Sequence, residues 1–187
     1  MKKVQKGEFG YIHYRRITQT VFTVLLFALS ISIFLMGYYT THTKKNLLTI
    51  VAILGCLPAS KNAVNMIMFY IADSCSDALH DKIVRAVGQL DGFYDLFFTA
   101  EKQNFQVSHL VVTQTSIIGI TESSKTDENE FEKHIKNILN KDKISGITVK
   151  LFRDPDKYCR RLEELNQSEE VQAKRDDIVS TLYHVSL

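Results

Sequence analysis

Residues 46–73 read NLLTIVAILGCLPASKNAVNMIMFYIAD, and how this stretch relates to a membrane decides the fold class. Two apolar runs flank the polar insert PASKN, with Lys61 near its middle. About 20 helical residues rise roughly 30 Å, which is the thickness of the hydrocarbon core of a bilayer. We therefore expect a membrane span at about 47–66, followed by an interfacial apolar stretch up to residue 72.

The predictions for the structure and function of this span rest on four of its residues. Pro58 lacks an N–H and clashes with the preceding turn, so a kink is expected near Leu54. Gly55 and Ala59 have the small-xxx-small spacing that lets another helix approach closely. Lys61 either reaches the inner interface with its long side chain or holds a functional position on a substrate or ion path. A re-entrant or strongly broken segment is the third alternative.

A second apolar segment precedes this one. Residues 18–39 contain no charged side chain, and a helix of that length rises about 33 Å, enough to cross the hydrocarbon core. A signal peptide is the rival interpretation, but its apolar region is usually only about 7–15 residues long, and no small-residue cleavage site follows here. The sequence therefore predicts a basic leader over 1–17 and a two-helix transmembrane hairpin over 18–73.

The charges indicate the orientation of this hairpin. Residues 1–73 hold eight Lys/Arg and two Asp/Glu, whereas residues 74–187 hold fifteen and nineteen. Five of the basic residues lie in the leader and two in the connection between the apolar segments, so the positive-inside rule places both termini in the cytoplasm of a cell-membrane protein. The excess of basic residues lies beside the apolar segments, so nucleic acid is not an expected partner.

The three cysteines show no paired or metal-type spacing and are expected to be reduced.

Residues 74–187 have the patterning of a small α/β (α+β) domain. Helical periodicity and strand-like apolar runs predict the order α-β-β-β-α-β-α-α. The expected helices are 77–90, 127–141, 154–166 and about 169–185, and the expected strands are 93–100, 105–114, 116–122 and 146–152. Asp127 with Glu130 has capping-box spacing, and Asp154 precedes a proline suited to the first helical position.

The stretch VSHLVVTQTSIIGITESSK, residues 107–125, resembles the nuclease-related (NERD) domains of the restriction-endonuclease-like fold. The likeness covers roughly residues 77–152 and implies a metal-dependent phosphodiesterase layout. The family's Asp on the second strand falls on Ser108, and its Glu and Lys on the third strand fall near Thr121 and Ser123. Mg²⁺ needs carboxylate ligands, so we expect the nuclease site to be degenerate.

A shifted nuclease site is the enzyme alternative. It would use Asp81, Glu122 and Lys125, with Mg²⁺ as the only cofactor, but a one-residue slip sends a strand side chain to the opposite face. No other cofactor or metal is expected. Cys75, Asp77, His80 and Asp81 lie within seven residues and are expected to form a solvated helix start. His109 lies between apolar strand residues and is expected to be either packed or exposed at a sheet edge, rather than catalytic.

The membrane segments carry a second resemblance. The stretch TKKNLLTIVAILGCLPASKNAVNMIMF, residues 43–69, resembles uncharacterised two-helix membrane proteins of clostridial-type Gram-positive bacteria. This likeness implies a location and a layout. The expected function is a membrane-anchored, non-catalytic binding or assembly domain, whose partners are membrane lipid and either another protein or further copies of the chain. The alternatives are a membrane-tethered nuclease-like enzyme and an accessory subunit of a transport complex that uses Lys61.

Overall fold

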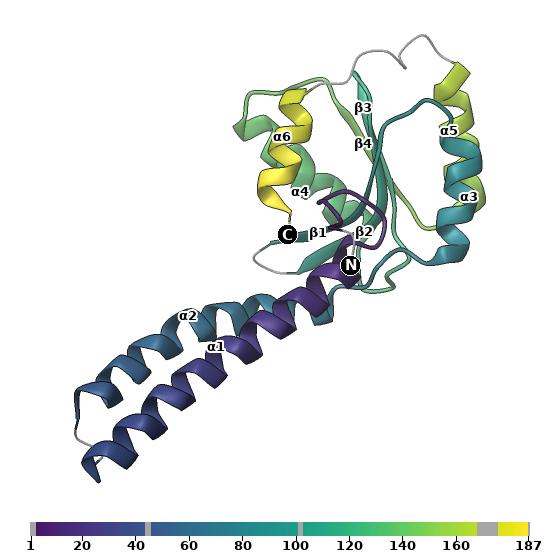
Figure 1. Cartoon of the computed structure of the whole chain (residues 1–187). Helices are drawn as coiled ribbons and strands as arrows, with labels where there is room; N and C mark the ends of the chain where they lie inside the picture. Colours follow the sequence, from purple (N-terminus) through teal and green to yellow (C-terminus); the bar gives the residue numbers. More distant parts are fainter. Residues whose placement is uncertain (1–2, 44–45, 101–102, 168–175, 187) are drawn as a thin grey trace. The chain divides into compact units, whose positions relative to one another are not determined.

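The computed structural model describes residues 3–43, 46–100, 103–167 and 176–186 (Figure 1). The chain forms two compact units. Residues Ile12–Ala72 make up one unit, and the residues before Ile12 join Asp73–Leu187 in the other. In sequence, Ile12–Ala72 are therefore an insertion between the first residues of the α/β unit and its remainder.

Two long apolar helices form the first unit. Helix α1 spans Tyr11–Thr41 and helix α2 spans Leu47–Ile71. Both are long and apolar enough to cross a membrane. Helix α2 continues through Pro58 without interruption, so the structure contains no re-entrant break there. The helix also runs past residue 66 to Ile71, so it includes most of the stretch expected to lie at the interface.

Glycines of both helices lie where α1 and α2 pack together. A methyl group added at Gly55 of α2 would lie 2.9 Å from the Ser30 hydroxyl oxygen of α1, and one added at Gly37 of α1 would lie 2.7 Å from Cβ of Leu48 of α2. Ala59 is fully buried. Small residues let two backbones approach closely when no water is available to drive association. The spacing of Gly55 and Ala59 therefore serves the hairpin itself.

Arginine side chains connect the first turns of α1 to the last turn of α2. The Arg16 guanidinium donates to the carbonyl oxygens of Phe69 and Ala72, at 3.1 and 2.8 Å. The Arg15 guanidinium lies 5.4 Å from the centre of the Phe69 ring. The last carbonyls of a helix have no partner within the helix and carry partial negative charge, so a cation stabilises them.

Among its described residues, the second unit contains one sheet and four helices. The sheet has the strand order β1-β2-β3-β4, with antiparallel β1/β2 and β2/β3 pairs and a parallel β3/β4 pair. The elements are α3 (Asp77–Val87), β1 (Gly92–Thr99), β2 (Asn104–Val112), β3 (Ser116–Ile120), α4 (Glu128–Lys141), β4 (Thr148–Phe152), α5 (Pro155–Gln167) and α6 (Asp176–Val185). This mixed α+β architecture agrees with the predicted order of elements. The expected start of the last helix falls within 168–175, outside the described residues.

Helices cover both faces of the sheet, with α3 and α5 on one side and α4 and α6 on the other (Figure 1). Each face buries its own apolar cluster. The predicted capping of α4 is confirmed, because Asp127 accepts a 2.9 Å hydrogen bond from the amide of Glu130. Asp154 likewise accepts from the amide of Asp156 at 3.0 Å, as its place before Pro155 predicts.

The leader packs on the α/β unit. The carbonyl oxygen of Gly7 accepts a 2.7 Å hydrogen bond from the amide of Tyr94 in β1. The Phe9 ring stacks on His80 of α3, with 3.9 Å between the ring centres. Residues at the two ends of the chain thus build one domain around an inserted helix pair.

Candidate functional site

Three polar side chains hold the segment that follows α2. Gln106 of β2 exchanges two hydrogen bonds with the backbone of Asp73, at 3.2 and 2.6 Å. Asp95 of β1 accepts from the Ser74 hydroxyl and from the Cys75 amide, both at 2.7 Å. We call Asp95, Gln106 and Glu122 the linker clamp, because together they bind residues 73–76.

Glu122 completes the clamp beyond the end of β3. Its two carboxylate oxygens accept from the amide and the hydroxyl of Ser76, at 2.9 and 2.6 Å. Ser76 is the N-cap of α3 and accepts from the amide of Leu79 at 3.2 Å. A carboxylate beside a helix N-terminus is stabilised by the unpaired amides and by the helix dipole. Glu122 therefore anchors the start of α3.

Hydroxyl groups occupy the positions where the nuclease resemblance requires an acid or a lysine. Ser108 and Thr121 are buried, and Ser123 is half-buried. The Ser108 hydroxyl accepts from the amide of Glu122 at 3.3 Å, and the Thr121 hydroxyl accepts from the amide of Ser123 at 3.1 Å. These neutral oxygens shape the turn after β3, and they lack the charge that Mg²⁺ ligands supply.

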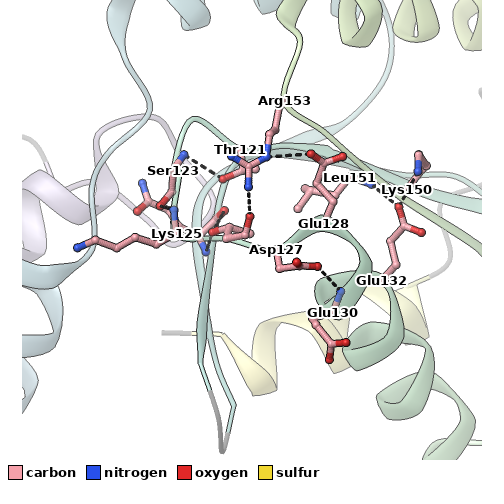
Figure 2. Close-up of polar contacts among 12 residues, drawn as sticks. Thr121, Ser123, Lys125, Asp127, Glu128, Glu130, Glu132, Lys150, Leu151 and Arg153 are labelled. Carbon is pink, nitrogen blue, oxygen red and sulfur yellow. Dashed lines mark hydrogen bonds and ion pairs between the residues drawn. The ribbon is translucent and has the colours of Figure 1, made fainter.

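The shifted nuclease residues lie in separate surroundings. Asp81 is exposed on α3, Glu122 is engaged with Ser76, and Lys125 is exposed in the loop after β3. Figure 2 shows the Lys125 side chain extending away from the Arg153–Glu128 pair. In the described part of the chain, no three His, Cys, Asp or Glu side chains are placed to hold a metal ion.

Two ion pairs join β4 and the residue after it to α4 (Figure 2). Arg153 donates to the Glu128 carboxylate at 2.8 Å and to the carbonyl oxygen of Thr126. Glu132 pairs with Lys150 at 3.0 Å and accepts from the amide of Leu151 at 3.3 Å. These contacts fasten α4 to β4, so Arg153 and Lys150 already have acidic partners.

Buried rings pack beside the clamp, between the sheet and α3 and α5. His109 is 1% exposed, and its Nδ1 lies 2.7 Å from the Tyr158 hydroxyl oxygen. The Tyr94 ring lies 4.4 Å from His109 and 5.0 Å from His80, measured between ring centres. Of the two expected positions for His109, packed or exposed at a sheet edge, the structure has the packed one.

Burial sets the protonation state of these groups. It lowers the pKa of His109 to about 3, with His80 as a second cause, so the ring is neutral at pH 7. Nε2 of His109 and Nδ1 of His80 have no hydrogen-bond partner among the described residues. Burial also raises the pKa of Cys75 to about 12, assisted by the nearby carboxylates of Glu122 and Asp95. The Cys75 thiol is therefore a poor nucleophile at neutral pH.

Lys61 lies on the exposed side of α2, together with Leu54, Leu57 and Val64. It therefore points away from the surface that packs against α1. Eight helical residues separate it from Phe69, where Arg16 binds, which is ~12 Å along the helix axis. If the span instead ended at residue 66, Lys61 would lie roughly 7–8 Å from that end.

Sequence patterns missed two members of the clamp. Asp95 interrupts the apolar run FYDLFF, and an acid in a buried strand needs hydrogen-bond donors, so this signal was present. Gln106 gives no such signal, because it alternates with apolar neighbours like any half-exposed strand residue. Its contact with Asp73 joins residues 33 positions apart.

Comparison with protein-family models, with curated proteins and with solved structures gave no match to this chain.

Proposed function

We propose that this chain is a two-pass membrane protein whose α/β domain binds a protein partner at the cytoplasmic surface. The linker clamp is the observation that carries this proposal. A carboxylate that could have contributed to a metal site instead fastens the domain to the segment leaving α2, and the neighbouring hydroxyls complete a turn. The hydroxyl groups of Ser108 and Thr121 shape the turn that carries Glu122, so they help to attach the domain to this segment.

The packing of the leader supports the two-pass arrangement. Residues 5–9 and the residues after Ala72 pack in one unit, so they occupy one compartment. The inserted helices must then cross the bilayer an even number of times, and both are long enough to cross it once. The five basic residues of the leader favour the cytoplasm for this compartment.

A topology experiment follows from this arrangement. Single cysteines introduced at Leu187 and Thr43, in a chain without its native cysteines, should react differently with an impermeant maleimide. We expect labelling of Thr43→Cys in intact cells and labelling of Leu187→Cys after the cells are opened. Labelling of Leu187→Cys in intact cells would contradict the cytoplasmic orientation.

Partner recruitment is tested by crosslinking and affinity capture from native membranes. We expect a discrete protein to be recovered with the wild-type chain and with Asp81→Ala, which changes an exposed residue outside the clamp. Recovery should fall with Asp95→Ala, which opens the clamp. Recovery of lipid alone, or equal recovery with all three chains, would contradict recruitment by the folded domain.

The enzyme alternative keeps one supporting observation, the α-β-β-β-α-β order shared with the restriction-endonuclease-like resemblance. The purified full chain in detergent micelles should leave DNA and RNA intact in the presence of Mg²⁺ or Mn²⁺. Cleavage that disappears in Glu122→Gln would revive the shifted nuclease site. Cleavage that persists in this variant would place the activity elsewhere in the chain.

The transport alternative rests on the exposed position of Lys61 along α2. A cation on a lipid-facing surface is costly unless it reaches the interface or meets an anionic partner. Lys61→Leu should leave partner capture unchanged if the lysine only contacts lipid headgroups. Loss of a captured membrane subunit in this variant, with retention in Val64→Leu, would favour the transport alternative.

A further inference from the structure

The outer edge of β1 is occupied by the two ends of the chain. The carbonyl oxygen of Gly7 accepts from the amide of Tyr94, and Ser186 forms an isolated bridge with Phe98 farther along the same strand. Strand β1 is the end strand of the sheet, so this edge would otherwise offer free backbone groups. We call residues 5–9 the leader strap.

A lysine binds the strap to the last helix. Nζ of Lys6 donates to the carbonyl oxygens of Tyr183 and Ser186, both at 2.7 Å, at the negative end of α6. The Tyr183 hydroxyl donates back to the carbonyl oxygen of Lys6 at 3.1 Å. Burial lowers the pKa of Lys6, so holding this ammonium in place depends on the helix carbonyls.

A glycine and an aromatic ring give the strap its shape. Gly7 has φ +89°, and a methyl group there would overlap the Tyr183 hydroxyl and lie 3.1 Å from the Phe93 ring. The Phe9 ring stacks on His80 and meets the edge of Tyr94, with 5.7 Å between ring centres. The strap therefore places a lysine, a glycine and an aromatic residue on this surface in the order Lys-Gly-x-aromatic.

The strap is held by separate contacts rather than by a continuous strand ladder. Two backbone carbonyls, an ammonium group and a ring bind it. Gly10 follows it with φ +80°, and a methyl group there would meet no atom within 4 Å. A glycine in open space with positive φ can change conformation at little cost, which makes it a suitable hinge.

We propose that the surface formed by the β1 edge, the end of α6 and His80 is a peptide-binding site that the leader strap fills in cis. A protein partner carrying an extended Lys-Gly-x-aromatic segment binds there by displacing the strap. Addition of a strand to a sheet edge supplies main-chain affinity, and the ammonium and ring positions supply specificity. This proposal rests on the proposed function and names the surface that recruits the partner.

Occupation in cis makes the site selective. A tethered segment competes at an effective concentration on the order of millimolar, so a weakly bound segment in trans cannot displace it. Opening the strap should therefore increase binding of a free peptide. The matched probe is the peptide KVQKGEFG, which has the sequence of residues 3–10.

The test uses the full chain in detergent micelles and the fluorescently labelled peptide. Lys6→Met combined with Phe9→Ala opens the strap, and this variant should bind the peptide at least tenfold more tightly than the wild type does. Lys3→Met, which changes an exposed lysine of the same leader, should behave like the wild type. The control peptide KVQAGEAG should not bind. Equal affinity for the opened and wild-type chains would overturn the proposal.

Hydrogen exchange of the wild-type chain gives a second test that needs no variant. The amide of Tyr94 should exchange at least tenfold faster than the amides of β2, because strap opening requires no unfolding of the sheet. Equal exchange rates would overturn the proposal.

The peptide and capture experiments together separate this proposal from the proposed function. If the opened chain binds the peptide but no partner is captured from membranes, the peptide-binding site stands and partner recruitment is contradicted. Partner capture that the opened and wild-type chains share, without peptide binding, would reject the strap site alone.

Discussion

Replacement of Asp95 by alanine should open the segment between α2 and α3. The buried carboxylate of Asp95 accepts two 2.7 Å hydrogen bonds, from the Ser74 hydroxyl and the Cys75 amide. Hydrogen bonds to a charged group contribute about 1.5–3 kcal/mol each, and removal leaves the buried amide unsatisfied. Relief of the desolvation of the carboxylate offsets part of this loss, so we expect a net loss of about 3 kcal/mol.

The backbone of Asp95 adds to this cost. Its φ is +56°, a left-handed conformation that asparagine and aspartate tolerate better than alanine does. Asp95→Asn retains an acceptor for the Cys75 amide and keeps this backbone tolerance. Asparagine should therefore cost much less than alanine, which separates loss of the hydrogen bonds from loss of charge.

Cys75 is the natural reporter of this opening. It is buried, and burial raises its pKa to about 12, so it should react with a maleimide only when the segment opens. In a chain with Cys56→Ser and Cys159→Ser, a loss of about 3 kcal/mol corresponds to labelling roughly 100-fold faster in Asp95→Ala. The labelling rate of Asp95→Asn should stay within about tenfold of the parent's rate, and that of Asp81→Ala should equal the parent's rate. A rate for Asp95→Ala within threefold of the parent would refute the reasoning.

Three further predictions concern other contacts. Gly92→Ala would place a methyl group against Nε2 of His109 and should cost about 1–3 kcal/mol in thermal unfolding, with a smaller cost when His109→Ala is also present. Burial lowers the pKa of His109 to about 3, below its unfolded value of roughly 6.5, so the unfolded chain binds the proton more readily between these values. Stability should therefore fall as pH falls below about 6.5, by up to ~1.4 kcal/mol per pH unit in denaturant titrations, and His109→Asn should flatten this slope. Gly55→Leu should separate α1 from α2 and lower the melting temperature in detergent, because its side chain meets Ser30, whereas Leu57→Ala on the exposed side should not.

The elements of the α/β domain could be predicted because each has a local signal. Phe131, Ile135 and Leu139 recur on one face of α4, and all three are buried. The pattern was less informative in β1, where Tyr94 and Leu96 are two residues apart yet pack in different clusters. Asp95 lies between them with its positive φ, and this backbone change moves the strand out of regular alternation.

The candidate site was harder to predict than the elements. Glu122 and Lys125 were selected for their similarity to nuclease residues, but Glu122 caps the start of α3 and Lys125 extends away from the neighbouring ion pair. The leader was expected to be a basic tail, and its Phe9 and Lys6 instead pack on α3 and α6. These contacts depend on where distant segments meet, and residue identity carries little information about that.

Local composition by itself determined the two membrane-competent helices and the order of helices and strands. A long uncharged run and a repeat of apolar residues act over a single helix or strand, so each can be recognised without its neighbours. Only the tertiary structure decided that the leader closes the β1 edge and that Asp95, Gln106 and Glu122 meet residues 73–76. The physical reason is that these hydrogen bonds join residues 20–46 positions apart for the clamp and 177–180 apart for Lys6. Such partners are selected by the packing of the whole sheet and its helices.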